Sequence, residues 1–216
     1  MSQDNERPTD QPQVPPWLAA TVLVLLLAVV GAAGFIIRGQ FDEGASAQST
    51  REIERKEEVV ERDPEDVEGL LALGASYHQA GRLREAIEKF ERVLEIRPFD
   101  TAALYGKGLV FIDQGNDREA EETLWDVLER DPGHVLAAET LGQFYAERGE
   151  YRSLIYTVRP VVEKNESSAD LQYLMGLGYE NLGRGDWAAA RYRLALKYFP
   201  GMPEAREGLE RLGVVE

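Results

Sequence analysis

The fold is decided by GASYHQAGRLREAIEKFERVLEIRPFDTAALYGKGLVF, residues 74–111. A glycine opens this stretch at Gly74 and another follows at Gly108, and each has an aromatic residue three positions later, Tyr77 and Phe111. The same pair recurs every 34 residues along the chain, as Gly142 with Tyr145 and Gly176 with Tyr179. A fixed period of this length indicates stacked helix pairs, which present a surface rather than enclose a reaction centre.

Other positions keep the same register. A second glycine comes seven residues after the first, and we expect it to end the first helix in a left-handed conformation. The second helix then carries a small residue, a large apolar residue and a closing proline. In repeat order these positions are Gly81, Gly115, Gly149 and Gly183; Ala86, Ala120, Leu154 and Ala188; Phe90, Leu124, Val158 and Tyr192; Pro98, Pro132, Glu166 and Pro200. The early glycine, having no side chain, lets the two helices of a pair approach closely.

With these positions assigned, the chain resembles the tetratricopeptide repeat family, whose pattern is this alternation of small and large residues closed by a proline. The resemblance implies an all-α fold, a right-handed solenoid of antiparallel helix pairs over residues 51–216. The full repeats are expected at 67–100, 101–134, 135–168 and 169–202. A half repeat at 51–66 precedes them, and a cap helix at 203–214 follows.

Two places depart from the pattern. In the cap helix, Glu210 occupies the place of the glycine, and we expect close approach to be unnecessary at that position because no partner helix follows. In repeat three, Pro160 falls inside the second helix and Glu166 replaces the closing proline, which predicts a kink near Tyr156 and a looser loop after Lys164. These changes indicate either a hinge or widened groove between repeats three and four, or ordinary drift between repeats.

The N-terminal region divides into three parts. Residues 1–16 are polar and are predicted to form a disordered tail. Trp17 to Ile37 is an uncharged run long enough for one transmembrane helix, and residues 38–50 have the composition of a flexible linker. The acidic leader and the length of the run favour an uncut anchor over a cleaved signal peptide or a buried core helix.

We therefore expect a single-pass protein of the bacterial inner membrane. Arg38 and the basic residues beyond it favour a cytoplasmic location of the repeats by the positive-inside rule. A short tail before a first apolar segment is also how a signal anchor exports the domain that follows it. We favour the extracytoplasmic location, and the cytoplasmic one stays open.

Composition narrows the classes of function. The chain has 24 Lys plus Arg against 39 Asp plus Glu, a net charge of −15, which argues against binding nucleic acid. It has no cysteine, so disulfides and thiolate metal sites are excluded. His78 and His134 lie far apart without the spacing of metal ligands. We expect neither an enzyme nor a cofactor or metal site.

The family resemblance places the candidate binding surface on the first helices, which form a concave groove. The residues expected to line it are Leu71, Ala75, His78, Tyr105, Leu109, Ile112, Glu139, Gln143, Glu147, Tyr173, Leu177 and Asn181. Family members that clamp a C-terminal carboxylate use Lys, Arg and Asn on this face, and the corresponding places here hold Leu71, Tyr105, Glu139 and Tyr173. The surface suits a peptide or helix with apolar anchors and basic flanks. The alternative is that some of these side chains merely pack against neighbouring first helices.

We interpret the chain as a membrane-anchored scaffold or assembly factor that recruits a protein partner through this groove. Its layout is similar to that of bacterial single-span repeat proteins, among them subunits of cytochrome c maturation systems. The alternative function is a self-associating structural component of a membrane complex, a homo-oligomer in which Ala28, Gly31 and Ala32 help the membrane helices meet.

Overall fold

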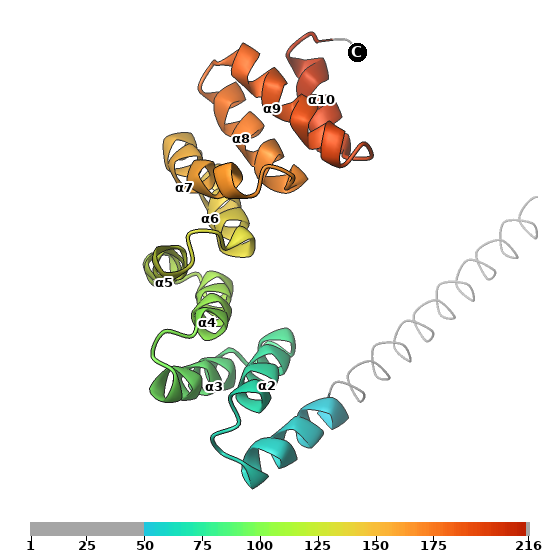
Figure 1. The fold of residues 1–216 in the computed structure, drawn as a ribbon. Coiled ribbons are helices and arrows are strands. Elements are labelled where there is room, and N and C mark those ends of the chain that lie inside the picture. The colour runs from blue at the N-terminus through green and yellow to red at the C-terminus, as the bar shows by residue number, and fades with distance from the viewer. Residues whose placement is uncertain (1–49, 215–216) are drawn as a thin grey trace, which may run out of the picture. The chain divides into compact units, whose positions relative to one another are not determined.

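A computed structural model describes residues 50–214, and in this part of the chain every regular element is a helix (Figure 1). The compact unit that carries the repeats begins at Ile53. Its leading helix ends at residue 62. The helices that follow are α2 (Val67–Gln79), α3 (Leu83–Ile96), α4 (Thr101–Asp113), α5 (Asp117–Arg130), α6 (Val135–Glu147), α7 (Tyr151–Lys164), α8 (Ala169–Asn181), α9 (Gly185–Tyr198) and α10 (Pro203–Arg211).

The helices pack as consecutive pairs, α2 with α3 through α8 with α9, and each pair packs on the next. Every first helix has 13 residues and every second helix has 14. Each predicted 34-residue window therefore contains one pair. The leading helix packs ahead of the first pair, burying Ile53, and α10 follows the last.

The first helices end as the second glycine of each window predicts. Gly81, Gly115, Gly149 and Gly183 all have φ of 71° or 72°, which is the left-handed region. The amide after each glycine donates back across the turn, for example from Arg82 N to the Tyr77 carbonyl oxygen at 2.8 Å. The last carbonyls of a helix have no amide partner within the helix. This hydrogen bond supplies a partner for one of them.

Side chains cap three of the first helices at their N-termini. The Asp100 carboxylate accepts from the Ala103 amide at 3.0 Å, and the Ser168 hydroxyl accepts from the Leu171 amide at 3.3 Å. At the start of α6 the acceptor is His134 Nδ1, 3.1 Å from the Ala137 amide nitrogen. His134 is thereby a structural capping residue.

The early glycines face the large residue of their own second helix. A β-carbon on Gly74 would lie 2.8 Å from the Phe90 ring, and one on Gly108 would lie 2.8 Å from the Leu124 side chain. Phe90 meets a second glycine from the next repeat, because a β-carbon on Gly106 would lie 2.5 Å from its ring. The large side chain thus fills the space that two missing side chains leave open on either side of it.

Within the described residues no second helix follows α10, so Glu210 stands where no partner helix requires a glycine. The cap helix packs closely through Gly208 instead, which corresponds to Gly106 three repeat lengths earlier and, like it, faces the second helix of the preceding repeat. A β-carbon on Gly208 would overlap the ring of Tyr192 on α9. Arg211 at the end of α10 also donates to the Glu180 carboxylate at 2.8 and 3.0 Å, which ties α10 to α8.

In repeat three, α7 continues through Pro160 without a break. The loop after it is held rather than loose, since the Asn165 side-chain amide donates to the carbonyls of Val161 at 3.1 Å and Gly133 at 3.2 Å. One buried polar group of this helix is unsatisfied. Thr157 is 2% exposed, and its hydroxyl has no hydrogen-bond partner among the described residues.

The buried residues form two hydrophobic clusters that meet at α4. Ala103 and Val110 belong to the N-terminal cluster, which begins at Ile53. Leu104, on the same helix, belongs to the C-terminal cluster, which runs through α5 to α10. Neighbouring side chains of α4 therefore serve different parts of the core.

The predicted transmembrane segment, Trp17 to Ile37, the tail 1–16 and nearly all of the linker 38–50 lie outside the described residues. Between residues 50 and 214 no helix combines the length and the apolar character needed to span a bilayer.

Candidate functional site

The predicted groove residues all lie on the first helices, and none of them is fully buried. Ala75, Gln143, Glu147 and Asn181 are exposed, and the other eight are half-buried. The structure brings four of the twelve together around one hollow, which we call the groove hollow. Its volume is about 470 Å³, and it lies between α6, α8 and the start of α10. The lining residues are Gln143, Ala146, Glu147, Asp170, Tyr173, Leu174, Leu177, Phe199, Gly201, Met202, Pro203 and Glu204.

One side of the groove hollow is apolar. Tyr173 and Leu177 stand one helical turn apart on α8, and Phe199, at the end of α9, is 53% exposed. The Tyr173 ring packs on Tyr192 with the ring centroids 5.9 Å apart, so its position is fixed by the core. These side chains offer an anchor site for an apolar group of a partner.

The charge around the groove hollow is of one sign. Glu147, Asp170 and Glu204 line it, and no Lys, Arg or His does. Within residues 50–214 none of these three carboxylates forms an ion pair or a side-chain hydrogen bond, so their charge is available to a partner. Glu139 lies beside this group: burial raises its pKa, and the nearby Asp170 carboxylate raises it further. Such a site favours positively charged partners.

The predicted residues nearer the N-terminus are engaged in contacts between repeats. His78 Nε2 lies 2.6 Å from an Asp113 carboxylate oxygen. The Tyr105 ring packs on His134 at 5.4 Å, and its hydroxyl lies 3.2 Å from the Thr140 hydroxyl. Leu71 and Ile112 pack against the core. For Leu71, Tyr105 and Ile112 the packing alternative therefore holds, at least for part of the side chain.

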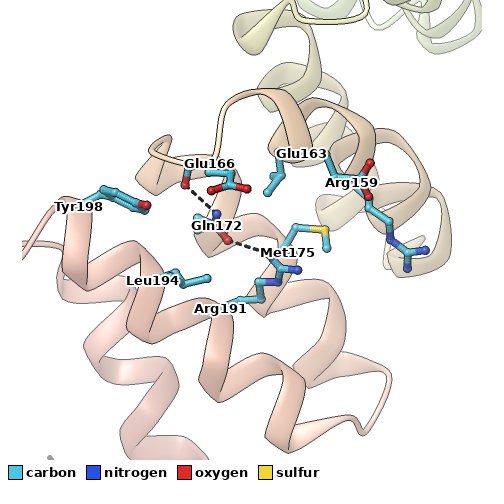
Figure 2. A pocket seen from close by; sticks show the side chains of 9 residues that line it. Arg159, Glu163, Glu166, Gln172, Met175, Arg191, Leu194 and Tyr198 are labelled. Atoms are coloured by element: carbon cyan, nitrogen blue, oxygen red, sulfur yellow. Dashed lines mark hydrogen bonds between the residues drawn. The ribbon is translucent and has the colours of Figure 1, made fainter.

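Figure 2 shows a second hollow, of about 280 Å³, between α7, α8 and α9. Its central polar residue is Gln172, which is 1% exposed. The Gln172 amide donates to the Glu166 carbonyl at 2.8 Å and accepts from Arg191 Nη1 at 3.0 Å. These hydrogen bonds satisfy the polar groups of the hollow, and they connect the loop after α7 to α8 and α9 of repeat four. Glu166, which replaces a closing proline, contributes only its backbone to this bond.

Nothing in the described part of the chain has the arrangement of a metal site, because no group of three His, Asp or Glu side chains converges there.

Comparison with known proteins agrees with the helix-pair geometry. The sequence model of the tetratricopeptide repeat family matches residues 77–133, from the end of the first helix of repeat one through repeat two. Residues 77–133 form a tetratricopeptide repeat region. The proteins of this family mediate protein–protein interaction, so a protein or peptide is the class of partner to expect for the repeat groove.

Solved structures of other repeat proteins share the fold. A crystal structure of MamA has a TM-score of 0.60 at 24% identity, over 68% of this chain and 86% of that one. MamA from Desulfovibrio magneticus RS-1, residues 41 to the end, gives 0.60 at 19% identity, over 68% and 84%. YrrB, a tetratricopeptide repeat protein described as having an unusual peptide-binding site, gives 0.59 at 18% identity, over 77% and 86%. At these identities the likeness concerns the fold alone. No curated protein matches the chain.

Several lining residues of the groove hollow were missed in the sequence. Phe199 and Met202 come from the connection between α9 and α10, and Glu204 comes from the first turn of the cap helix α10. A usable signal existed, because Phe199 and Met202 occupy the closing positions of repeat four, beside which the cap helix with Glu204 begins. Tyr173 and Leu177 were found because they follow the helical period on α8.

Proposed function

We propose that this repeat protein is a scaffold or assembly factor that holds a segment of a protein partner in the groove hollow. The single observation that carries the proposal is the combination of an exposed apolar wall with three unpaired carboxylates, Glu147, Asp170 and Glu204, and no basic residue. A segment with an apolar anchor and flanking Lys or Arg complements both features. The role is one of binding, without catalysis.

We further propose that the scaffold is anchored in the bacterial inner membrane through residues 17–37. The support is the uncharged run of sequence, whose length matches the hydrocarbon core. Its process would be the assembly of an envelope complex, and cytochrome c maturation is one such process that uses repeat proteins of this layout. Alkaline carbonate extraction of membranes tests the anchor: the full chain should stay in the pellet, and a chain lacking residues 17–37 should be released. Release of the full chain would contradict it.

Binding in the groove hollow can be measured on the full chain with a fluorescent peptide that alternates lysine and leucine. Glu147→Gln with Glu204→Gln should weaken binding about tenfold, because two uncompensated carboxylates facing the peptide are lost. Glu61→Gln is the matched control: it removes an exposed carboxylate from the leading helix, away from the hollow. Equal weakening by the control would show that net charge alone attracts the peptide and would overturn the proposal.

A further inference from the structure

A hollow of opposite charge lies on the second helix of repeat three. It has a volume of about 230 Å³ and is formed by α7 and by residues at the end of α8 and the turn before α9. The lining residues are Arg152, Ile155, Tyr156, Arg159, Tyr179, Leu182 and Arg184. Three are arginines and none is acidic, on a chain whose net charge is −15. We call it the arginine hollow; it shares no residue with the groove hollow.

The arginines of this hollow have no carboxylate partner anywhere in residues 50–214. The guanidinium of Arg184 lies over the Trp187 ring, 5.1 Å from its centroid, and Arg159 Nη2 makes a long contact of 3.4 Å with the Tyr179 hydroxyl. Other arginines of the array are neutralised: Arg82 contacts Glu85 at 2.9 Å, and Arg118 contacts Glu122 at 2.9 Å. The positive charge here is therefore available to an outside group.

The equivalent surface one repeat earlier has the reverse charge. On α5, 34 residues upstream, a hollow is lined by Arg118, Glu121, Glu122, Thr123, Trp125, Asp126 and Glu129. In this register Arg118 corresponds to Arg152, but its partner Glu122 is replaced by Tyr156, and Trp125 is replaced by Arg159. Both substitutions on α7 raise the local charge: one removes the carboxylate that would pair the first arginine, and the other adds a second arginine.

The tyrosine three positions after the early glycine shows the same reversal in the charge of its hydrogen-bond partner. In repeat one the Tyr77 hydroxyl donates to Glu57 at 2.5 Å, and in repeat three the Tyr145 hydroxyl donates to Glu121 at 2.5 Å. In repeat four the Tyr179 hydroxyl faces Arg159 instead. A carboxylate at this edge of the surface is thus supplied by the chain itself in two repeats, and repeat four presents a guanidinium to which an external carboxylate can bind.

Exposed apolar side chains surround the arginines. Tyr156 is 73% exposed, Trp187 is 53% exposed and Leu182 is 38% exposed. Trp187 is held in place by an edge contact with the Tyr179 ring, at 5.2 Å between centroids, and Tyr156 packs on Trp125 at 5.9 Å. Aromatic side chains in fixed positions and arginines are the residues that contribute most of the binding energy in protein interfaces.

The size of the hollow argues for a macromolecular ligand. Sites for whole small molecules usually measure about 300 to 1,000 Å³. The arginine hollow is smaller and accepts a single side chain, with the arginines spread around it. We propose that it is a second docking surface, which binds a protein segment carrying one apolar anchor residue flanked by Asp or Glu. The two hollows would then hold two segments of opposite charge on one array.

The test uses the full chain and a fluorescent peptide that alternates glutamate with phenylalanine, followed by anisotropy. We expect binding that Arg152→Glu with Arg159→Glu weakens at least about tenfold, since both charges on α7 are reversed. Arg84→Glu, at the position of α3 that corresponds to Arg152, is the matched control and should leave binding unchanged. Tyr156→Ser should weaken binding while keeping every charge.

Four outcomes would overturn the proposal. The first is that Arg152→Glu with Arg159→Glu weakens binding of a peptide with lysine in place of glutamate by the same factor. The second is equal weakening by Arg84→Glu. The third is complete displacement of the peptide by inorganic phosphate with no effect of Tyr156→Ser, which would leave only an anion site. The fourth is a concentration-dependent dimer abolished by the Arg152 and Arg159 changes, which would make a second copy the occupant. Glu147→Gln with Glu204→Gln should not reduce binding of the acidic peptide, so failure of one surface is distinguishable from failure of the other.

Discussion

The ring of Tyr192 on α9 lies directly against Gly208 on α10, and Gly176 on α8 contacts the same ring from the other side. The arrangement repeats that of Phe90 between Gly74 and Gly106 at the start of the array. The two rings are 102 residues apart, three repeat lengths. In repeat three the second helix carries the smaller Val158 at this position. Leu174 then stands at the position that corresponds to Gly208, and its larger side chain fills the space that Val158 leaves.

Gly208→Ala should destabilise the array. The added methyl group overlaps a buried ring that Gly176 and Gly208 already enclose, which costs about 1 to 3 kcal/mol. This exceeds the gain of about 1 kcal/mol from better helix propensity. Urea unfolding followed by circular dichroism measures it. Gly185→Ala is the control, because its nearest contact is the Leu212 side chain at 3.6 Å and the variant should be no less stable than the parent.

Thr157→Val should stabilise the protein by about 1 kcal/mol. The Thr157 hydroxyl is buried in α7 without a hydrogen-bond partner, and valine has the same shape without the polar group. The thermal unfolding midpoint should rise. Thr140→Val should not raise it, since that hydroxyl lies 3.2 Å from the Tyr105 hydroxyl. An unchanged or lower midpoint for Thr157→Val would mean that the hydroxyl finds a partner in solution.

Alkaline pH should weaken the contact between the leading helix and α2. Burial, and then the hydrogen bond to Glu57, raise the pKa of Tyr77 to about 12. The folded state therefore prefers the protonated phenol, and its contribution is complete below pH 10 and is lost as the pH rises through about 12. Tyr77→Phe should be less stable than the parent at pH 8, and this difference should narrow between pH 10 and 12. A difference that stays constant across this range would contradict the prediction.

Acid pH should weaken the attachment of the cap helix. The Arg211 guanidinium, together with the hydrogen bond from Tyr192, holds the pKa of Glu180 below its usual value. The stabilisation is present above the ordinary carboxylate pKa and is lost as the pH falls through the lowered one. Since Arg211 is half-exposed, Glu180→Gln should cost only about 1 kcal/mol at pH 7, and nothing at pH 2. Thermal melts at the two pH values give the comparison.

The repeat register was predictable because packing and backbone geometry constrain the same positions in each window. Gly81 and its equivalents adopt positive φ, and Gly74 and its equivalents face a large side chain. Both requirements leave a glycine in the sequence, which can be read without a structure. Gly208 was missed because the register was built on Gly74 and its equivalents, whereas Gly208 corresponds to Gly106 and faces the second helix of the preceding repeat.

The binding surfaces were less accessible to sequence reasoning. The α8 part of the groove hollow follows the helical period, but Phe199 reaches it from a connection that the period does not describe, and Glu204 from the first turn of the cap helix. The arginine hollow went unnoticed because second helices were considered only as packing partners. Its signal was present in the change from Glu122 to Tyr156 and from Trp125 to Arg159 between corresponding positions. Three-dimensional proximity of Arg184 to these residues could come only from the structure.

The division of the core at α4 bears on how the array comes apart. Both proposed docking surfaces are built on the C-terminal cluster, whereas the leading helix and repeat one depend on the N-terminal cluster. Tension or proteolysis acting from the N-terminal side would therefore disrupt the leading helix and repeat one first. Both proposed docking surfaces would then stay folded on the C-terminal cluster.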